Sequence, residues 1–238
     1  PNDIASYTAL ACIAIQSNQN DQHGGQSVCD FDYGLAVGVR KTYRRLFKKH
    51  LAEAVDLLTE VADEHPFVEE LLARVEEATG TVASLEMDEG FRAAVLAELT
   101  EAGIEAAIAE TAVAYAAKNA ARDADRSTFQ AMEALVHNLN TMHSRAGAQT
   151  PFSSVNYGMD TSPEGRMVIK NMLLATEEGL GGGETPIFPV QIFRVKEGVN
   201  YNPEDPNYDL FKLAMHCSAK RLFPNFSFLD APFNAQYY

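Results

Sequence analysis

The 238-residue sequence has no tryptophan, only three cysteines, and no apolar run near the ~20 residues that a membrane helix needs. Cys12, Cys29 and Cys217 form no Cys-X-X-Cys pair, and no histidine lies at zinc-finger spacing, so the sequence predicts no structural zinc site. Sparse, unpaired cysteines fit a reducing compartment and predict a cytoplasmic protein without a membrane partner. The start at Pro1 lacks the basic region of a signal peptide, and we expect an internal section of a longer protein.

Basic residues are also scarce, with 19 Lys and Arg against 33 Asp and Glu, which gives a formal net charge of -14. A protein that binds nucleic acid presents a basic face, so this balance argues against a nucleic-acid partner. The acidity is concentrated in residues 51–110, which hold 16 acidic residues and two basic ones. The apolar content of 46% is ordinary for a globular protein, and the chain is long enough to bury a substantial core.

The first half of the sequence, residues 1–139, is mainly helical in pattern. Asn2 or Asp3 can cap a first helix, which is expected to end near Ser17. A long helix is predicted over residues 31–58. Further amphipathic helices are expected over residues 51–119, with breaks at Pro66, Gly80 and Gly90. A separate helix is predicted to follow, with Ser127 as its N-cap.

Residues 140–238 alternate between strand and helix patterns. Strands are predicted after Pro151 and over residues 187–195 and 222–230, with helices from Pro163 and over residues 208–221 between them. The glycines of residues 179–183 lack the Gly-Lys-Ser/Thr ending of a phosphate-binding loop and predict a simple helix-to-strand link. Alternating strands and helices are typical of a parallel sheet, so the sequence predicts an α/β fold with a helical layer beside it.

The strand after Pro151 carries polar side chains on both of its faces. Phe152, Ser154 and Asn156 fall on one face, and Ser153 and Val155 fall on the other. A buried strand of a parallel sheet is usually rich in Val, Ile and Leu on both faces. The polar residues therefore predict a surface that meets a polar ligand.

The polar segment of residues 18–27 contains the adjacent glycines Gly24 and Gly25. Glycine and asparagine are common turn residues, so one interpretation is a surface turn. The other is a loop whose backbone approaches a ligand closely, which glycine permits.

Two rows of basic residues lie at helical spacing in this acidic sequence. They include Lys41, Arg44, Arg45 and Lys48 on the long helix, and Lys118 and Arg122 on a later helix. Cations on one face repel each other unless an anion offsets them, and a polyphosphate could do so. The alternative is a solvated face that is balanced by the acidic segment that follows.

Several blocks of sequence carry a resemblance to a known family. They are residues 23–27, 140–158, 164–170, 183–189, 196–203, 207–210 and 219–226. The blocks follow the family's order over nearly the whole chain. On these residues the sequence resembles the anaerobic (class III) ribonucleoside-triphosphate reductases, which are glycyl-radical enzymes.

The resemblance implies that residues 1–238 are an internal portion of one catalytic domain, a ten-stranded α/β barrel. The implied reaction is the anaerobic reduction of ribonucleoside triphosphates to 2′-deoxyribonucleoside triphosphates. A thiyl radical removes the ribose 3′ hydrogen, the 2′ hydroxyl leaves, and formate or a thiol system supplies electrons. The family's glycyl radical is installed by an activating protein that carries an iron–sulfur cluster and uses S-adenosylmethionine.

The family's radical cysteine, radical glycine and C-terminal zinc site have no counterpart in this sequence. We therefore predict no catalytic residue, metal ligand or cofactor within it. The resemblance also implies a homodimer, with substrate choice set by deoxynucleotide and ATP effectors. The alternative hypothesis is a nucleotide-binding or dimerisation module without chemistry of its own, and a third is a purely structural domain.

Two sets of binding residues are predicted for the segment that is present. The substrate set is His23, Gly24, Gly25, Gln26, Phe152, Ser153, Ser154 and Asn156. The set for the effector's phosphates is Lys41, Arg44, Arg45, Lys48, Lys118 and Arg122.

Overall fold

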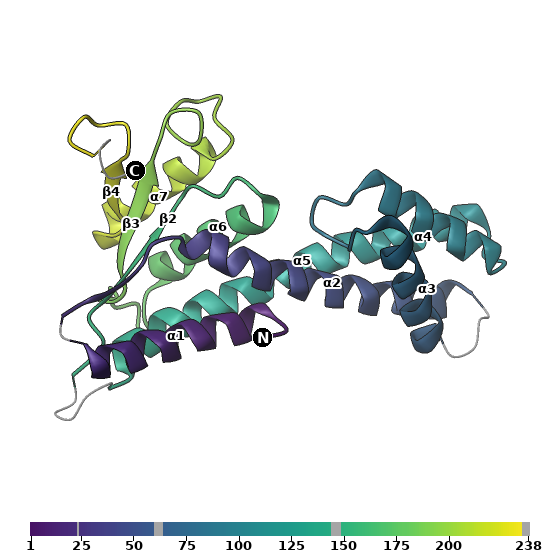
Figure 1. Ribbon diagram of the computed structural model, residues 1–238, viewed down its shortest axis with the longest axis horizontal. Coiled ribbons are helices and arrows are strands. Elements are labelled where there is room, and N and C mark those ends of the chain that lie inside the picture. The colour runs from purple at the N-terminus through teal and green to yellow at the C-terminus, as the bar shows by residue number, and fades with distance from the viewer. Residues whose placement is uncertain (23, 60–63, 144–148, 235–238) are drawn as a thin grey trace. The chain divides into compact units, whose positions relative to one another are not determined.

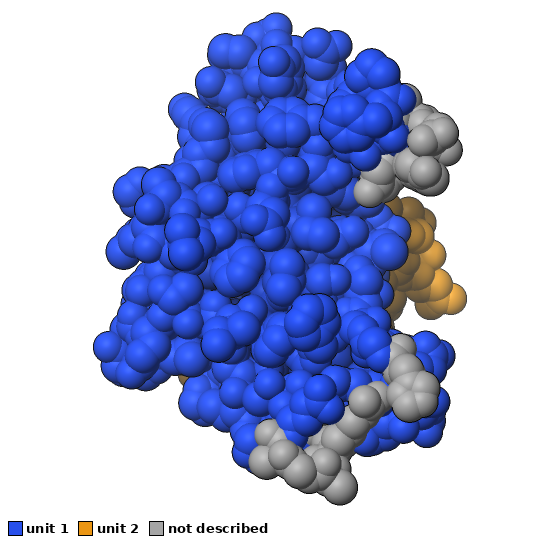
Figure 2. All heavy atoms as spheres, turned by 90° about the vertical axis from the view of Figure 1, so that its left-hand side faces the viewer, with its two compact units in different colours: residues 1–39, 127–238 blue, residues 40–126 orange. Residues whose placement is uncertain are grey.

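A computed structural model of the chain describes residues 1–22, 24–59, 64–143 and 149–234 (Figure 1). The chain divides into two compact units, which Figure 2 distinguishes by colour. Unit 1 comprises residues 1–39 and 127–238, and unit 2 comprises residues 40–126.

Unit 1 contains a four-stranded sheet in which neighbouring strands follow the chain order, β1-β2-β3-β4, and every pair is parallel. The strands are β1 (Gln26–Val28), β2 (Ser153–Tyr157), β3 (Val190–Val195) and β4 (Asn225–Phe228). Helix α6 (Pro163–Glu178) connects β2 to β3, and α7 (Tyr208–Arg221) connects β3 to β4. The predicted α/β class with a parallel sheet is therefore confirmed.

One side of the sheet packs on an aromatic cluster. The ring centroids of Tyr157 and Phe193, on neighbouring strands, lie 5.8 Å apart. Phe211 of α7 stacks on Phe193 at 6.1 Å and meets Phe226 of β4 at 5.8 Å. Tyr157 and Phe193 are fully buried, so this side of the sheet faces the core that α7 covers.

Unit 1 also includes α1 (Ile4–Asp21), the start of α2 (Phe31–Leu58) and the end of α5 (Ala106–Thr141). Helix α1 lies along the C-terminal part of α5 in Figure 1, and the Cys12 thiol contacts the Asn138 side chain there. Two predicted boundaries are confirmed, those of α2 and α7.

Capping explains where two helices begin. Asp3 accepts a hydrogen bond from the Ser6 N–H at 2.8 Å at the start of α1. Ser162 accepts one from the Gly165 N–H at 3.1 Å at the start of α6, and the following proline occupies the first turn, as predicted. Helix α1 extends beyond the predicted end at Ser17, because Gln19 still faces the core and is 1% exposed.

Four local predictions are wrong. Strand β1 replaces the last part of the predicted polar loop, because Gln26 to Val28 pair with β2. Ser127 is not an N-cap but lies inside the continuous helix α5. Pro66 and Gly90 do not end helices, since each lies in the first turn of its helix, where proline and glycine are tolerated. The break at Gly80 is confirmed, with a φ of 68°.

Unit 2 is helical and includes α3 (Glu64–Thr79) and α4 (Glu89–Glu101) with parts of α2 and α5. Its core includes Phe47 and Phe91, both fully buried, whose ring centroids lie 6.4 Å apart. His50, for which the sequence favours a surface position, is instead buried between two carboxylates. Its Nδ1 lies 2.8 Å from Glu53 Oε2, and its Nε2 lies 2.9 Å from Asp123 Oδ2. None of the helices in the described part of the chain has the length and apolar content to cross a membrane.

The buried cysteines are expected to resist alkylation. Cys12 and Cys217 are 3% and 0% exposed, and burial raises the pKa of each thiol to about 11, whereas Cys29 is exposed. Because the thiolate is the nucleophile, iodoacetamide at pH 8 should modify Cys29 at least about 100-fold faster than the other two. Peptide mapping by mass spectrometry measures the three rates, and equal labelling of Cys217 in the folded protein would contradict the burial.

The same two thiols should make stability depend on alkaline pH. Unfolding returns them to the ordinary pKa of 9.0, so the unfolded chain loses these protons at a lower pH than the folded protein does. The free energy of unfolding should therefore fall as the pH rises from about 9 to about 11. Urea titrations across that range test this, with a Cys12→Ala and Cys217→Ala double variant as the control that should lose most of the slope.

Candidate functional site

The side of the sheet opposite the aromatic cluster is largely polar. The strand registers place Ser154 opposite Ser27, Asn156 opposite Ile192, and Arg194 opposite Ser227. We call this side the polar face; its members are Ser27, Ser154, Asn156, Val190, Ile192, Arg194, Asn225 and Ser227. A serine, asparagine or arginine from every strand thus points to one side of the sheet.

Two buried atoms of the polar face have no hydrogen-bond partner among the described residues. They are Asn156 Oδ1, an acceptor, and Arg194 Nε, a donor. Arg194 is 8% exposed, and its Nη2 donates to Asp30 Oδ1 at 2.7 Å, so its guanidinium is held in place. A buried polar atom without a partner costs roughly 1–3 kcal/mol. The two atoms therefore indicate that their partner is a ligand, a water molecule or a group outside the described residues.

A buried carboxylate fixes the loop that follows β2. Asp32 is fully buried, and its Oδ2 accepts the N–H groups of Gly158, Met159 and Asp160 at 2.8, 2.9 and 3.0 Å. The Asn200 side chain donates to the carbonyl oxygens of Gly158 and Arg194, at 2.9 and 2.8 Å. These bonds lock the carboxyl ends of β2 and β3, the end of a parallel sheet at which ligands usually bind.

The structure brings two predicted segments together although they lie far apart in the sequence. The Gln26 N–H donates to the Phe152 carbonyl at 2.9 Å, and a Cβ on Gly25 would lie 2.8 Å from the Phe152 ring. Gly25 is thus needed for close packing against Phe152, which is itself 57% exposed. Gly24 has a φ of 93° and open space around it. His23 lies outside the described residues.

Not all of the predicted substrate set lies on one face. Gln26 and Ser153 are opposite each other in the register, and both lie on the side of the sheet that carries Tyr157. Ser153 is fully buried, and its hydroxyl donates to the Pro151 carbonyl at 3.2 Å. Ser154 and Asn156 are half-buried on the polar face.

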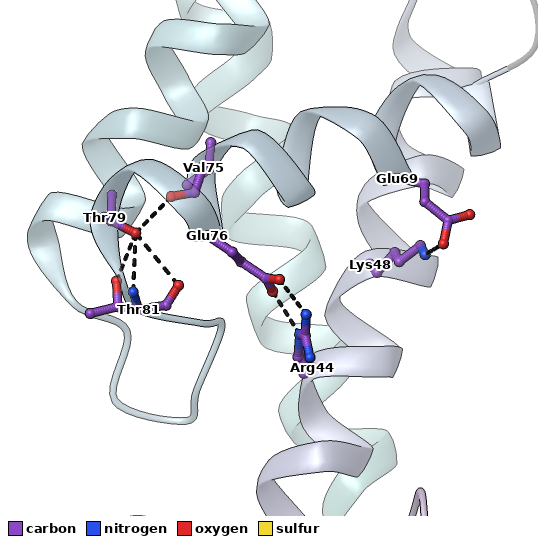
Figure 3. Close-up of polar contacts among 7 residues, drawn as sticks. All are labelled: Arg44, Lys48, Glu69, Val75, Glu76, Thr79 and Thr81. Atoms are coloured by element: carbon purple, nitrogen blue, oxygen red, sulfur yellow. Dashed lines mark hydrogen bonds and ion pairs between the residues drawn. The ribbon is translucent and has the colours of Figure 1, made fainter.

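The basic rows of unit 2 are partly neutralised by acidic side chains, as Figure 3 shows for two of them. Arg44 makes two hydrogen bonds to Glu76 of α3, one of them at 2.6 Å, and Lys48 pairs with Glu69 of the same helix. The hydrogen bond from Lys48 lowers the pKa of Glu69. This pairing with α3 favours the alternative of a charge-balanced, solvated face, although exposed pairs of this kind contribute little stability.

The other predicted effector residues are exposed. Lys41 and Arg45 lie on the outer side of α2, and Lys118 and Arg122 lie on α5. Arg122 donates to the adjacent Asp123 at 3.0 Å. Four cations therefore remain accessible to solvent, within reach of an anion that approaches the surface of unit 2.

The described residues contain no group of three or more His, Cys, Asp or Glu side chains that could hold a metal ion.

Two residues that the structure places at the candidate site, Arg194 and Asp32, were not predicted from the sequence. Arg194 is the one charged residue of its strand, Val-Gln-Ile-Phe-Arg-Val, and a charge at that place is a signal that could have found it. Asp32 gives no such signal, because an aspartate in the first turn of a helix is ordinary.

The fold is that of an α/β protein whose parallel sheet has one largely polar face, and comparison with known proteins gives its family. Residues 1–237 match the family described as anaerobic ribonucleoside-triphosphate reductase. The chain therefore belongs to the anaerobic ribonucleoside-triphosphate reductase family, as the resemblance implied.

Three relatives with that same description are similar to parts of the chain. The Haemophilus influenzae protein is 38% identical over 102 residues, which cover 42% of this chain and 14% of the relative. The Escherichia coli protein is 36% identical over 101 residues, with the same two shares of 42% and 14%. The enterobacteria phage T4 protein is 39% identical over 114 residues, or 48% of this chain and 19% of the relative. The matched segments thus span between about a seventh and a fifth of these relatives.

Proposed function

We propose that this chain forms part of the catalytic barrel of an anaerobic ribonucleoside-triphosphate reductase, and that the polar face is part of its substrate-binding wall. The single observation that carries the proposal is the pair of buried, unpartnered atoms on that face, Asn156 Oδ1 and Arg194 Nε, in a member of this family. A purely structural sheet would have no reason to bury both atoms without partners.

The sheet topology supports membership of a larger barrel. The four strands are parallel, follow the chain order and are joined by helices, as in the wall of an α/β barrel. Strands β1 and β4 each pair with one neighbour among the described residues, so each has an edge that a further strand can extend.

The chemistry of the polar face suits a ribose. A sugar hydroxyl both donates and accepts, so it can donate to Asn156 Oδ1 and accept from Arg194 Nε. The Ser154 hydroxyl, which can either donate or accept a hydrogen bond, lies on the same face as Asn156. These groups would hold the sugar in a fixed orientation, which radical removal of one particular ribose hydrogen requires.

The remaining parts of the reaction belong, in this proposal, to other segments and other molecules. The thiyl and glycyl radicals, the formate or thiol reductant and the activating iron–sulfur protein are those of the family that the chain resembles. No residue of this chain is assigned to the radical chemistry. The proposal places the protein in the cytoplasm as a homodimer, with ribonucleoside triphosphate as its substrate.

We also propose that the exposed cations of unit 2 bind the phosphates of a deoxynucleotide or ATP effector. Arg45 and Arg122 are the members to test, because their loss would remove charge without breaking the Arg44–Glu76 pair. If these cations only balance the charge of nearby acidic residues, neither Arg45→Ala nor Arg122→Ala will change the affinity for the effector.

Nucleotide binding to the polar face can be tested by NMR with CTP as the probe. CTP should shift the side-chain signals of Asn156 and of Arg194 Nε–H. Asn156→Ala should weaken binding about 10-fold, since one hydrogen bond to a ligand is worth about 1.4 kcal/mol. Asn20→Ala, an exposed position on α1, is the matched control and should leave the affinity unchanged. If CTP leaves both signals unmoved in the wild-type protein, the proposed role of the polar face is wrong.

A further inference from the structure

A pocket lies at the carboxyl ends of β3 and β4, outside the polar face. Its volume is about 230 Å³, and it is lined by Val195, Glu197, Tyr201, Phe228, Asp230 and Ala231. Val195 and Phe228 are opposite each other in the register and alternate with Arg194 and Ser227 along their strands. Because alternate residues point to opposite sides of a sheet, the pocket is separate from the proposed substrate wall.

The walls of this pocket combine exposed aromatic rings with carboxylates. Tyr201 and Phe228 are 47% and 46% exposed, which is high for such large apolar side chains. Neither Glu197 nor Asp230 forms an ion pair in the described part of the chain. One oxygen of Asp230 accepts the Glu197 N–H at 2.8 Å, and the other accepts no hydrogen bond from the described residues. The lining of the pocket therefore carries two formal negative charges and two aromatic rings, and it includes no Lys or Arg.

The pocket is held in shape by hydrogen bonds of its own loop. Asp205 Oδ2 accepts the N–H groups of Gly198, Tyr201 and Asn202 at 3.1, 2.9 and 2.8 Å. The Leu229 N–H donates to the Val195 carbonyl at 2.9 Å, which continues the pairing of β3 with β4 to the floor of the pocket. A binding site that is already ordered loses little entropy when its ligand arrives.

We propose that this pocket binds the side chain of an arginine presented by a partner protein. A guanidinium is planar, stacks on aromatic rings and pairs with carboxylates through several N–H groups, so it matches both kinds of wall. An ammonium pairs with a carboxylate as a point charge but cannot stack in the same way. The net charge of -14 would also attract a basic partner over a distance. This inference is independent of nucleotide binding at the polar face.

The test is an NMR titration of the isotope-labelled chain with N-acetyl-arginine methylamide. Saturable shifts at Glu197, Tyr201 and Asp230, with a dissociation constant on the order of 1 mM, are expected for one side chain in an open pocket. The citrulline analogue has nearly the same shape without the charge, and it should bind at least about 10-fold more weakly. Equal binding of the arginine and citrulline probes, or of arginine and lysine probes, would overturn the proposal.

Variants of single lining residues distinguish the contribution of the carboxylates to arginine binding from that of the aromatic rings. Asp230→Asn keeps an oxygen for the Glu197 N–H but removes the charge, and it should weaken arginine binding several-fold. Tyr201→Leu removes a ring and should do the same, whereas Tyr201→Phe keeps the ring and should bind as the wild type does. Glu86→Gln, in unit 2, is the control for loss of charge alone. Wild-type affinity in both Asp230→Asn and Tyr201→Leu would show that this pocket is not the arginine site.

Discussion

Replacing Asp32 with alanine is expected to lower the free energy of unfolding by about 4 kcal/mol. One carboxylate oxygen of this fully buried side chain accepts the N–H groups of Gly158, Met159 and Asp160, all within 3.0 Å. The variant leaves three donors without their acceptor, and a hydrogen bond to a charged group is worth more than a neutral one. Urea unfolding followed by circular dichroism measures the loss.

Two further variants make this prediction specific. Asp32→Asn keeps a carbonyl oxygen for the three donors but loses the charge, so its cost should be roughly half that of the alanine variant. Asp21→Ala removes an exposed acidic side chain at the end of α1, and it should cost less than about 1 kcal/mol. If Asp32→Ala and Asp21→Ala are equally stable, the carboxylate of Asp32 does not hold the loop after β2.

Replacing Gly165 with alanine should destabilise the protein by about 3 kcal/mol, although alanine is the better helix former. A Cβ at this position of α6 would lie 2.1 Å from Asp160 Cγ and 2.5 Å from its Cβ. Asp160 is 5% exposed, and its Oδ1 accepts the Ser162 N–H at 2.9 Å, so the side chain cannot move away without breaking that bond. Thermal unfolding reports the change in stability.

Gly34→Ala is the matched control, because a Cβ on Gly34 of α2 would meet no described atom within 4 Å beyond its own stretch of helix. Alanine there should stabilise the protein by about 0.5–1 kcal/mol through helix propensity alone. The two substitutions are chemically identical and are predicted to have opposite signs. A stabilised Gly165→Ala variant would mean that the contact between α6 and Asp160 is looser than the structure shows.

Part of the candidate site followed from local pattern. The alternation of Phe152, Ser154 and Asn156 with Ser153 fixes which of them share a side, because a strand has a period of two. That pattern was enough to predict a polar, ligand-facing strand. It could not tell which side faces the core, and the structure places Ser153 with the buried aromatic residues.

The sequence by itself determined the helical character of the first half, the three longer strands and the parallel α/β class, since these depend on hydrophobic period and turn residues within short windows. It also carried the blocks that mark the family. Only the tertiary structure decided that residues 26–28 form a strand, because three residues have no period and gain their hydrogen bonds from β2. Likewise, the unpartnered atoms of Asn156 and Arg194 and the three bonds of Asp32 depend on contacts between distant segments. Such contacts are set by packing, for which a local pattern holds no signal.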